Sequence, residues 1–111
     1  MNKKLLHGTL TTIILKLLKD NGEMYGYEIV QHVKELTKDQ MQITEGALYP
    51  SLHKLEGEGL LSVDYKKFQN RTRKYYSLTE EGAKETQSQV ADLFSFMQQL
   101  QTLLDAKPKL T

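Results

Sequence analysis

Cysteine and tryptophan are both absent from this 111-residue chain, and proline occurs only twice. Without cysteine the chain has no disulfide framework, no thiolate nucleophile and no cysteine-ligated metal site. The three histidines, His7, His32 and His53, fall in separate predicted elements, and there is no HExxH motif or carboxylate–histidine cluster. We therefore expect no metal site, no cofactor, no catalytic residue and no enzymatic activity.

Long hydrophobic runs are also missing. The most apolar stretch, LTTIILKLL at residues 10–18, has nine residues and includes Lys16. A membrane-spanning helix needs about 20 apolar residues, and a secretory signal needs an apolar region followed by a small-residue cleavage site. We therefore expect no membrane span and no signal peptide, and a cytoplasmic location.

The charge balance is uneven although the net charge is only +1. Residues 62–79 carry five basic side chains and one acidic one, whereas residues 80–105 carry one basic and five acidic. Apolar and polar residues alternate over residues 61–66 and 73–78, around a link that contains Gln69 and Asn70. This pattern predicts a β-hairpin. Basic side chains near its tip can reach DNA phosphates, and those side chains are Lys66, Lys67, Arg71, Arg73 and Lys74.

A helix is predicted before the hairpin, with Thr44 as its N-cap and Gly59 just beyond its C-terminus, where a positive φ is needed. Leucines at i, i+4 and i+7 define its buried face. The opposite face carries glycines and a proline instead of the usual Glu, Lys or Gln. Alone, this pattern also fits a kinked surface helix, but beside a basic hairpin it favours a surface shaped to enter a DNA groove. The candidate contacts are Glu45, Gly46, Tyr49, Pro50, Ser51, His53 and Lys54.

Two further helices are predicted before this one. The first covers residues 8–19, where a stripe of apolar residues marks one buried face. Leu15 lies off that stripe and indicates a second buried face, against a partner chain. Residues 1–7 are expected to form an arm, with Lys3 and Lys4 either near DNA or in a disordered basic tail. The second helix covers residues 26–37, and Tyr25 at its start is either a core anchor or a phosphate contact.

The last helix is predicted to begin after Thr79, a second N-cap, and to continue to about residue 105. Apolar side chains step along it by three and four residues in an unbroken heptad pattern. Phe94, Phe96 and Leu103 add a second apolar edge, which one small domain is too small to cover. Pairing with a second chain is therefore favoured over a helix folded back on its own domain. The candidate dimer contacts are Leu15, Val90, Leu93, Met97, Leu100 and Leu104.

Together these elements predict a mainly α fold with a small β-hairpin. Residues 1–79 would form a winged helix-turn-helix domain, residues 80–107 a dimerisation helix and residues 108–111 a loose tail.

Four segments resemble the PadR family of bacterial transcriptional regulators, in its short form with a single C-terminal dimerisation helix. They are GTLTTIILKLL at 8–18, MYGYEI at 24–29, EGALYPSLHKLEGEGLL at 45–61 and RKYYSLTEEG at 73–82. The resemblance implies a homodimeric winged-helix protein that binds double-stranded DNA, usually as a repressor. Its recognition helix would enter the major groove, and two copies would bind a pseudo-palindromic operator.

The resemblance also implies release from DNA by a small hydrophobic or aromatic effector. Because the chain lacks tryptophan, a planar ligand would stack on a phenylalanine or a tyrosine. The candidate pocket residues are Leu15, Phe94, Phe96 and Met97.

Two alternatives remain open at this point. A winged-helix module that binds protein would keep the core and the last helix but would not need the basic hairpin. A protein that is mainly a small-molecule sensor would show an apolar cavity between the first and last helices.

Overall fold

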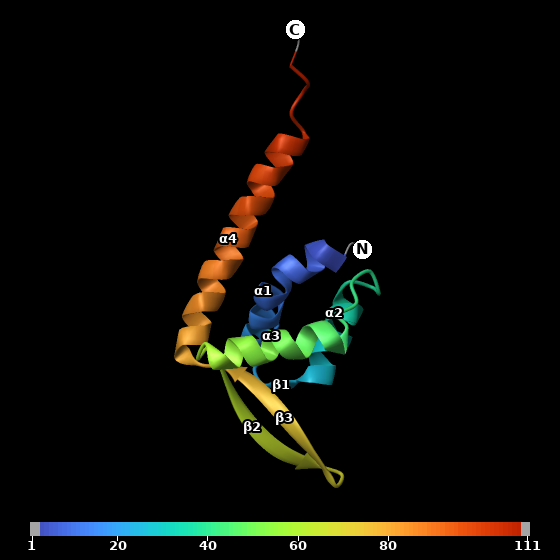
Figure 1. Cartoon of the computed structure of the whole chain (residues 1–111), viewed down its shortest axis with the longest axis vertical. Helices are drawn as coiled ribbons and strands as arrows, with labels where there is room; N and C mark the ends of the chain where they lie inside the picture. Colours follow the sequence, from blue (N-terminus) through green and yellow to red (C-terminus); the bar gives the residue numbers. More distant parts are fainter. Residues whose placement is uncertain (1–2, 110–111) are drawn as a thin grey trace.

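The computed structural model describes residues 3–109, and Figure 1 shows its arrangement. The elements in chain order are α1 (Lys3–Asn21), β1 (Met24–Tyr25), α2 (Gly26–Leu36), α3 (Glu45–Gly57), β2 (Leu61–Phe68), β3 (Arg71–Leu78) and α4 (Glu80–Leu104). The strands form an antiparallel sheet in the order β1-β3-β2. The β2–β3 hairpin, called the wing below, projects from one side of the helices, and α4 extends in the other direction. The predicted mainly helical fold with a β-hairpin and a long last helix is confirmed.

The core lies where α1, α2 and α3 meet the base of the wing. The predicted buried face of α3, made of Leu48, Leu52 and Leu55, is fully buried. Leu15 of α1 is also fully buried, because α1 packs against α3 and β3 as well as α4. A side chain without exposed surface has no contact area for a partner chain or a ligand. The structure therefore contradicts both expectations for Leu15, as a dimer contact and as a pocket residue.

α1 begins earlier than predicted, at Lys3 instead of residue 8. The expectation of an arm is therefore wrong for residues 3–7, and residues 1 and 2 lie outside the described part of the chain. Leu6 packs against the core from this additional turn, which explains why the helix continues. Lys3 and Lys4 are thus held on a helix.

The predicted caps and turns are confirmed. The backbone N–H of Ala47 donates to the Thr44 hydroxyl at 3.2 Å, and Gly59 has a φ of +77°. The wing turn is shorter than expected, with only Gln69 and Asn70 between the strands, at φ values of 48° and 66°. Positive φ at both central residues is the type I′ geometry that suits the twist of a hairpin.

The short strand β1 was not predicted. It has two residues, too few to show a periodic pattern, and it pairs Met24 with Tyr76 and Tyr25 with Tyr75. β1 joins the base of the wing to the first turn of α2. This pairing sets Tyr25 beside the wing.

α4 begins in tight contact with the connection between α3 and β2. The Thr79 hydroxyl donates to the carbonyl of Gly59 at 2.7 Å and accepts the N–H of Gly82 at 3.0 Å. The N–H of Thr79 also donates to the carbonyl of Leu60 at 3.1 Å. A Cβ atom at Gly82 would lie only 2.0 Å from that Leu60 oxygen. Glycine is therefore required where α4 starts.

Candidate nucleic-acid interface

The outer face of α3 carries most of the predicted contact residues. Its buried leucines point into the core, and the opposite face is exposed to solvent. Exposed there or in the first turn are Glu45, Gly46, Tyr49, Pro50, His53 and Lys54. Ser51 is half-buried, and its hydroxyl donates to the Ala47 carbonyl at 3.1 Å. The helix thus brings six of the seven candidates to one open surface, whereas Ser51 is partly turned back to its own helix.

Tyr49 connects this surface to α2. Tyr49 is 45% exposed, but its hydroxyl lies so close to Gly26 that a Cβ atom there would approach within 2.6 Å. Burial of the hydroxyl end raises the pKa of the Tyr49 phenol, and the Glu45 carboxylate adds to the shift. The phenol is therefore neutral at physiological pH, with its hydroxyl against α2 and one side of its ring open to solvent.

The register of the wing divides its five basic residues between two faces. Lys66 pairs with Arg73, and Phe68 pairs with Arg71, two positions away on each strand. The basic side chains of Lys66, Arg71 and Arg73 therefore lie on one face of the wing. Lys67 and Lys74 lie on the other face, which buries Tyr76 against the core. The sequence located the five basic residues in the wing correctly but gave no sign of this division.

Three of the five basic side chains are held by other parts of the chain. Lys74 lies 3.4 Å from Glu56 of α3 and over the ring of Tyr76. Lys66 forms an ion pair with Glu23, and this hydrogen bond raises the pKa of Lys66. The third is Arg73, which contacts two aromatic rings.

Arg73 contacts Tyr25 and Phe68. Its guanidinium carbon is 4.3 Å from the centre of the Tyr25 ring and 4.1 Å from that of Phe68. The Tyr25 ring also meets Tyr75 edge-on at 5.4 Å. Tyr25, predicted as a core anchor or a phosphate contact, thus packs against the wing. Sequence analysis missed Phe68 and Tyr75, although both lie at alternate positions of the basic strands.

The remaining two basic residues of the wing are Lys67 and Arg71, next to the turn. Both are exposed, and neither has an ion-pair or aromatic partner within residues 3–109. They are the wing cations most available to a phosphate group.

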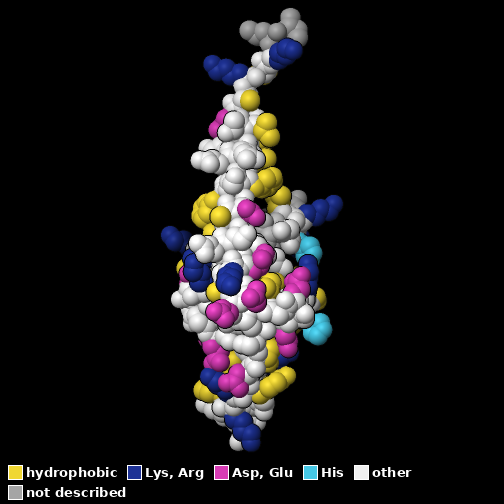
Figure 2. All heavy atoms as spheres, turned by 90° about the vertical axis from the view of Figure 1, so that its left-hand side faces the viewer, with side chains coloured by type: hydrophobic (Ala, Val, Ile, Leu, Met, Phe, Trp, Pro, Cys, Tyr) yellow, Lys and Arg dark blue, Asp and Glu magenta, His cyan; other side chains and the backbone are white. Residues whose placement is uncertain are grey.

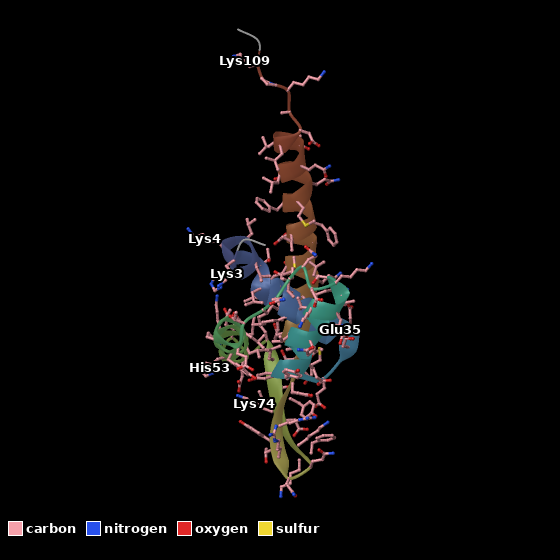
Figure 3. All side chains as sticks on the ribbon, turned by 90° about the vertical axis from the view of Figure 1, so that its right-hand side faces the viewer. Lys3, Lys4, Glu35, His53, Lys74 and Lys109 are labelled. Carbon is pink, nitrogen blue, oxygen red and sulfur yellow. The ribbon has the colours of Figure 1, made fainter. Side chains whose placement is uncertain are left out.

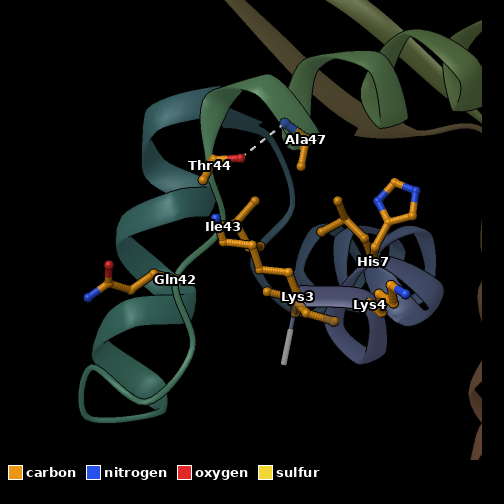
Figure 4. A pocket seen from close by; sticks show the side chains of 9 residues that line it. Lys3, Lys4, His7, Gln42, Ile43, Thr44 and Ala47 are labelled. Atoms are coloured by element: carbon orange, nitrogen blue, oxygen red, sulfur yellow. Dashed lines mark hydrogen bonds between the residues drawn. The ribbon is translucent and has the colours of Figure 1, made fainter. Parts of the chain in front are cut away.

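A hollow of about 370 Å³ lies beside the start of α3 (Figure 4). Its wall is mostly apolar and includes Leu10 of α1, Ile43 of the connection before α3 and Ala47 of α3. Lys3, Lys4 and His7 contribute to its α1 side. Figure 3 shows Lys3 and Lys4 on the same side of the molecule as His53 and Lys74, with Glu35 away from them. The basic end of α1 therefore extends the surface formed by α3 and the wing. His7 was not predicted as part of it.

α4 carries the other group of predicted site residues. Val90 and Leu93 are half-buried, and Met97, Leu100 and Leu104 are exposed. Figure 2 shows hydrophobic side chains along α4 and acidic ones around its lower part. A groove of about 230 Å³ separates α4 from α1 and is apolar over most of its wall. It is lined mainly by Ile13, Leu17, Val90, Leu93, Phe94 and Met97.

Of the candidate pocket residues, Phe94 and Met97 line this groove, whereas Phe96 does not. The Phe96 ring is 59% exposed and lies outside the groove. A hydrogen bond from the Thr12 hydroxyl to Gln89 at 2.8 Å fixes the distance between α1 and α4 near one end of the groove.

Within the described residues no group of three potential His, Cys, Asp or Glu ligands is close enough to hold a metal ion. No described helix is long and apolar enough to cross a membrane.

Comparison with known proteins agrees with this geometry. A structure of a transcriptional regulator from Clostridium thermocellum has a TM-score of 0.82 and 28% identity, covering 96% of this chain and 99% of that one. The crystal structure of a PadR family transcriptional regulator from Eggerthella lenta has a TM-score of 0.78 and 30% identity, covering 94% and 88%.

Among sequences, the transcriptional regulator YqjI of Escherichia coli is 30% identical over 77 residues, which are 69% of this chain but only 35% of that protein. This chain therefore corresponds to about a third of the length of YqjI. The family model described as transcriptional regulator PadR-like matches residues 14–88, from the middle of α1 into α4. The chain therefore belongs to the PadR-like family of transcriptional regulators, which bind DNA through a winged-helix fold.

Proposed function

We propose that this protein is a homodimeric repressor that binds a pseudo-palindromic operator and is released by a small hydrophobic or aromatic effector. The observation that carries the proposal is the exposed outer face of α3 beside a basic wing. A module that binds only protein would not need cations such as Lys67 and Arg71 at the wing tip. This surface favours DNA over the protein-binding alternative.

In the proposed complex, α3 enters the major groove and the wing follows the adjacent backbone. His53 and Lys54 are the α3 side chains with donor groups for base edges and phosphates. Lys67 and Arg71 contact phosphates or the minor groove at the wing tip. Lys3 contacts the backbone on the other side of α3. The division fits the general rule that phosphate contacts position a protein and base contacts give specificity.

Dimerisation is proposed through α4. The helix has 25 residues and is about 37 Å long at 1.5 Å per residue. α4 packs on α1, but every described residue of α4 beyond Leu93 is exposed, and Leu103 and Leu104 near its end are 73% and 75% exposed. A continuous apolar edge of this kind is typical of an interface with another chain. In a two-fold dimer joined by α4, the two α3 helices would need to lie about 34 Å apart to reach half-sites one helical turn apart.

The groove between α1 and α4 is the proposed effector site. It lies next to the proposed dimer face, so a bound ligand would change how two subunits meet. A ligand that favours the dimer with the wrong spacing between its α3 helices lowers operator affinity by linkage. Phe94 would supply the aromatic surface for such a ligand.

The proposed function is tested by fluorescence anisotropy with DNA from upstream of the gene and with a scrambled duplex of the same length. The native protein should prefer the upstream DNA, and His53→Ala with Lys54→Ala should lose that preference while its thermal unfolding stays unchanged. A reporter under the same DNA should be repressed by the native protein only. If the native protein binds neither duplex, the proposed DNA-binding function is contradicted.

The effector is tested by calorimetric titration of the dimer with hydrophobic and aromatic compounds, repeated with Phe94→Ala. A compound that binds the native protein should weaken operator binding and lose affinity in the variant. Compounds that bind without changing operator affinity would contradict effector release.

A further inference from the structure

We infer that Arg73 positions the wing relative to α3 and does not bind DNA phosphate. This inference rests on the proposed DNA-binding function. It assigns different roles to two arginines, Arg71 and Arg73, that share one strand and one face of the wing.

The environment of Arg73 carries the inference. Its guanidinium group lies over the rings of Phe68, near the tip of the wing, and of Tyr25, where β1 meets α2. Phe68 is diagonal to Arg73 across the hairpin, because Phe68 pairs with Arg71 and Lys66 pairs with Arg73. Arg73 therefore links the distal part of the wing to the helical core through two ring contacts. Its side chain is half-buried and contacts both rings.

The wing needs such a link because the third strand is short. β1 pairs only with Tyr75 and Tyr76, so the sheet is two-stranded from Arg71 to Lys74. A two-stranded hairpin alone is at best marginally stable in water. The Lys66–Glu23 ion pair is a second contact on this face between the wing and the segment before β1.

Tyr25 anchors this arrangement to α2. Its backbone N–H donates to Glu28 of α2 at 3.0 Å, and its ring meets Tyr75 edge-on. α2 in turn packs on α3, where Gly26 meets the hydroxyl of Tyr49. The path from wing tip to recognition helix is thus a chain of direct contacts. These contacts hold the wing at a fixed angle to α3 before DNA binds. Less ordering of the wing is therefore needed on binding.

Arginine suits this position better than lysine. A planar guanidinium stacks on two rings at once, whereas an ammonium group is a compact, strongly hydrated charge. Arg73→Lys therefore keeps the charge but loses the double stack. Arg71 offers the matched control, because it is exposed and makes no such contact within the described residues.

The test compares Arg71→Ala, Arg71→Lys, Arg73→Ala and Arg73→Lys in the full-length protein. Operator affinity is measured over a salt series, and amide hydrogen exchange of residues 64–72 is measured without DNA. Arg71→Ala should reduce the slope of log K against log salt by about 0.9, the value for one lost phosphate contact, and Arg71→Lys should retain the slope. Arg73→Lys should weaken binding by roughly three- to tenfold, as Arg73→Ala does, with the native slope. Both Arg73 variants should exchange faster in the wing, and the Arg71 variants should not.

Three results would overturn the inference. The first is native affinity for Arg73→Lys together with a reduced slope for Arg73→Ala, which would make Arg73 a phosphate contact. The second is unchanged affinity for both Arg73 variants, and the third is unchanged wing exchange. If the native protein itself binds no DNA, the proposed function fails, and hydrogen exchange still reports whether Arg73 orders the wing.

Discussion

Gly82→Ala should destabilise the protein by displacing the start of α4. A methyl group at Gly82 would lie 2.0 Å from the carbonyl oxygen of Leu60 and 3.0 Å from the carbonyl carbon. Contacts between carbon and oxygen are normally about 3.3–3.6 Å, so the two segments must separate by about 1 Å or more. The Leu60 oxygen cannot turn aside easily, because it accepts the N–H of Thr79.

The magnitude follows from these contacts. Overpacking at a close contact costs about 1–3 kcal/mol, and a weakened backbone hydrogen bond adds about 1 kcal/mol. We therefore expect the free energy of unfolding to fall by about 2–4 kcal/mol, which lowers Tm by roughly 9–17 °C in a chain of this size. Urea and thermal unfolding measure this at one fixed protein concentration, because the stability of the proposed dimer would depend on concentration.

Gly8→Ala is the matched control. Gly8 also lies within a helix, but a Cβ atom there would have no neighbour within 4 Å. Alanine should raise stability by about 0.5–1 kcal/mol, because glycine is unfavourable inside a helix. If Gly82→Ala proves as stable as the native protein, the contact between α4 and the α3–β2 connection is not as tight as described.

Three further results are expected. Leu100→Asp with Leu104→Asp should give monomers in sedimentation equilibrium without loss of helix content; a dimer that persists would move the interface away from the outer half of α4. Lys67→Ala with Arg71→Ala should reduce the salt slope of DNA binding by about 1.8, since two phosphate contacts at about 0.9 each are lost; an unchanged slope would exclude the wing tip from the interface. Because the pKa of Tyr49 is raised in the folded protein, its contribution to stability is complete below the unfolded pKa of about 10 and is lost as pH rises through the folded pKa. The pH dependence of unfolding in that range should therefore flatten in Tyr49→Phe, and an identical profile would contradict the burial of the phenol.

Local features of the fold could be predicted from the sequence because short segments determine them. Thr44 and Thr79 cap their helices through residues three positions away, and Gly59 ends α3 in a conformation that favours glycine. The buried leucines of α3 follow from helical spacing alone. The candidate contacts on α3 could be chosen for the same reason, since one helix face is fixed once the other is known.

Features that depend on distant segments could not be predicted. The separation of the wing cations depends on the pairing register, and the stacking of Arg73 needs Tyr25, 48 positions earlier in the chain. Leu15 was assigned to a partner chain because the sequence does not show that α4 and α3 cover both sides of α1. In each case the missing information is which elements pack together, not what each element is.

In the proposed complex, two symmetry-related copies of α3 enter the major groove. Methylation protection of guanine N7, which lies in the major groove, tests it directly on the upstream DNA. We expect two protected patches related by two-fold symmetry and about one helical turn, or ~34 Å, apart, both lost with His53→Ala and Lys54→Ala. A single protected patch, or protection that survives in this variant, would contradict the claim.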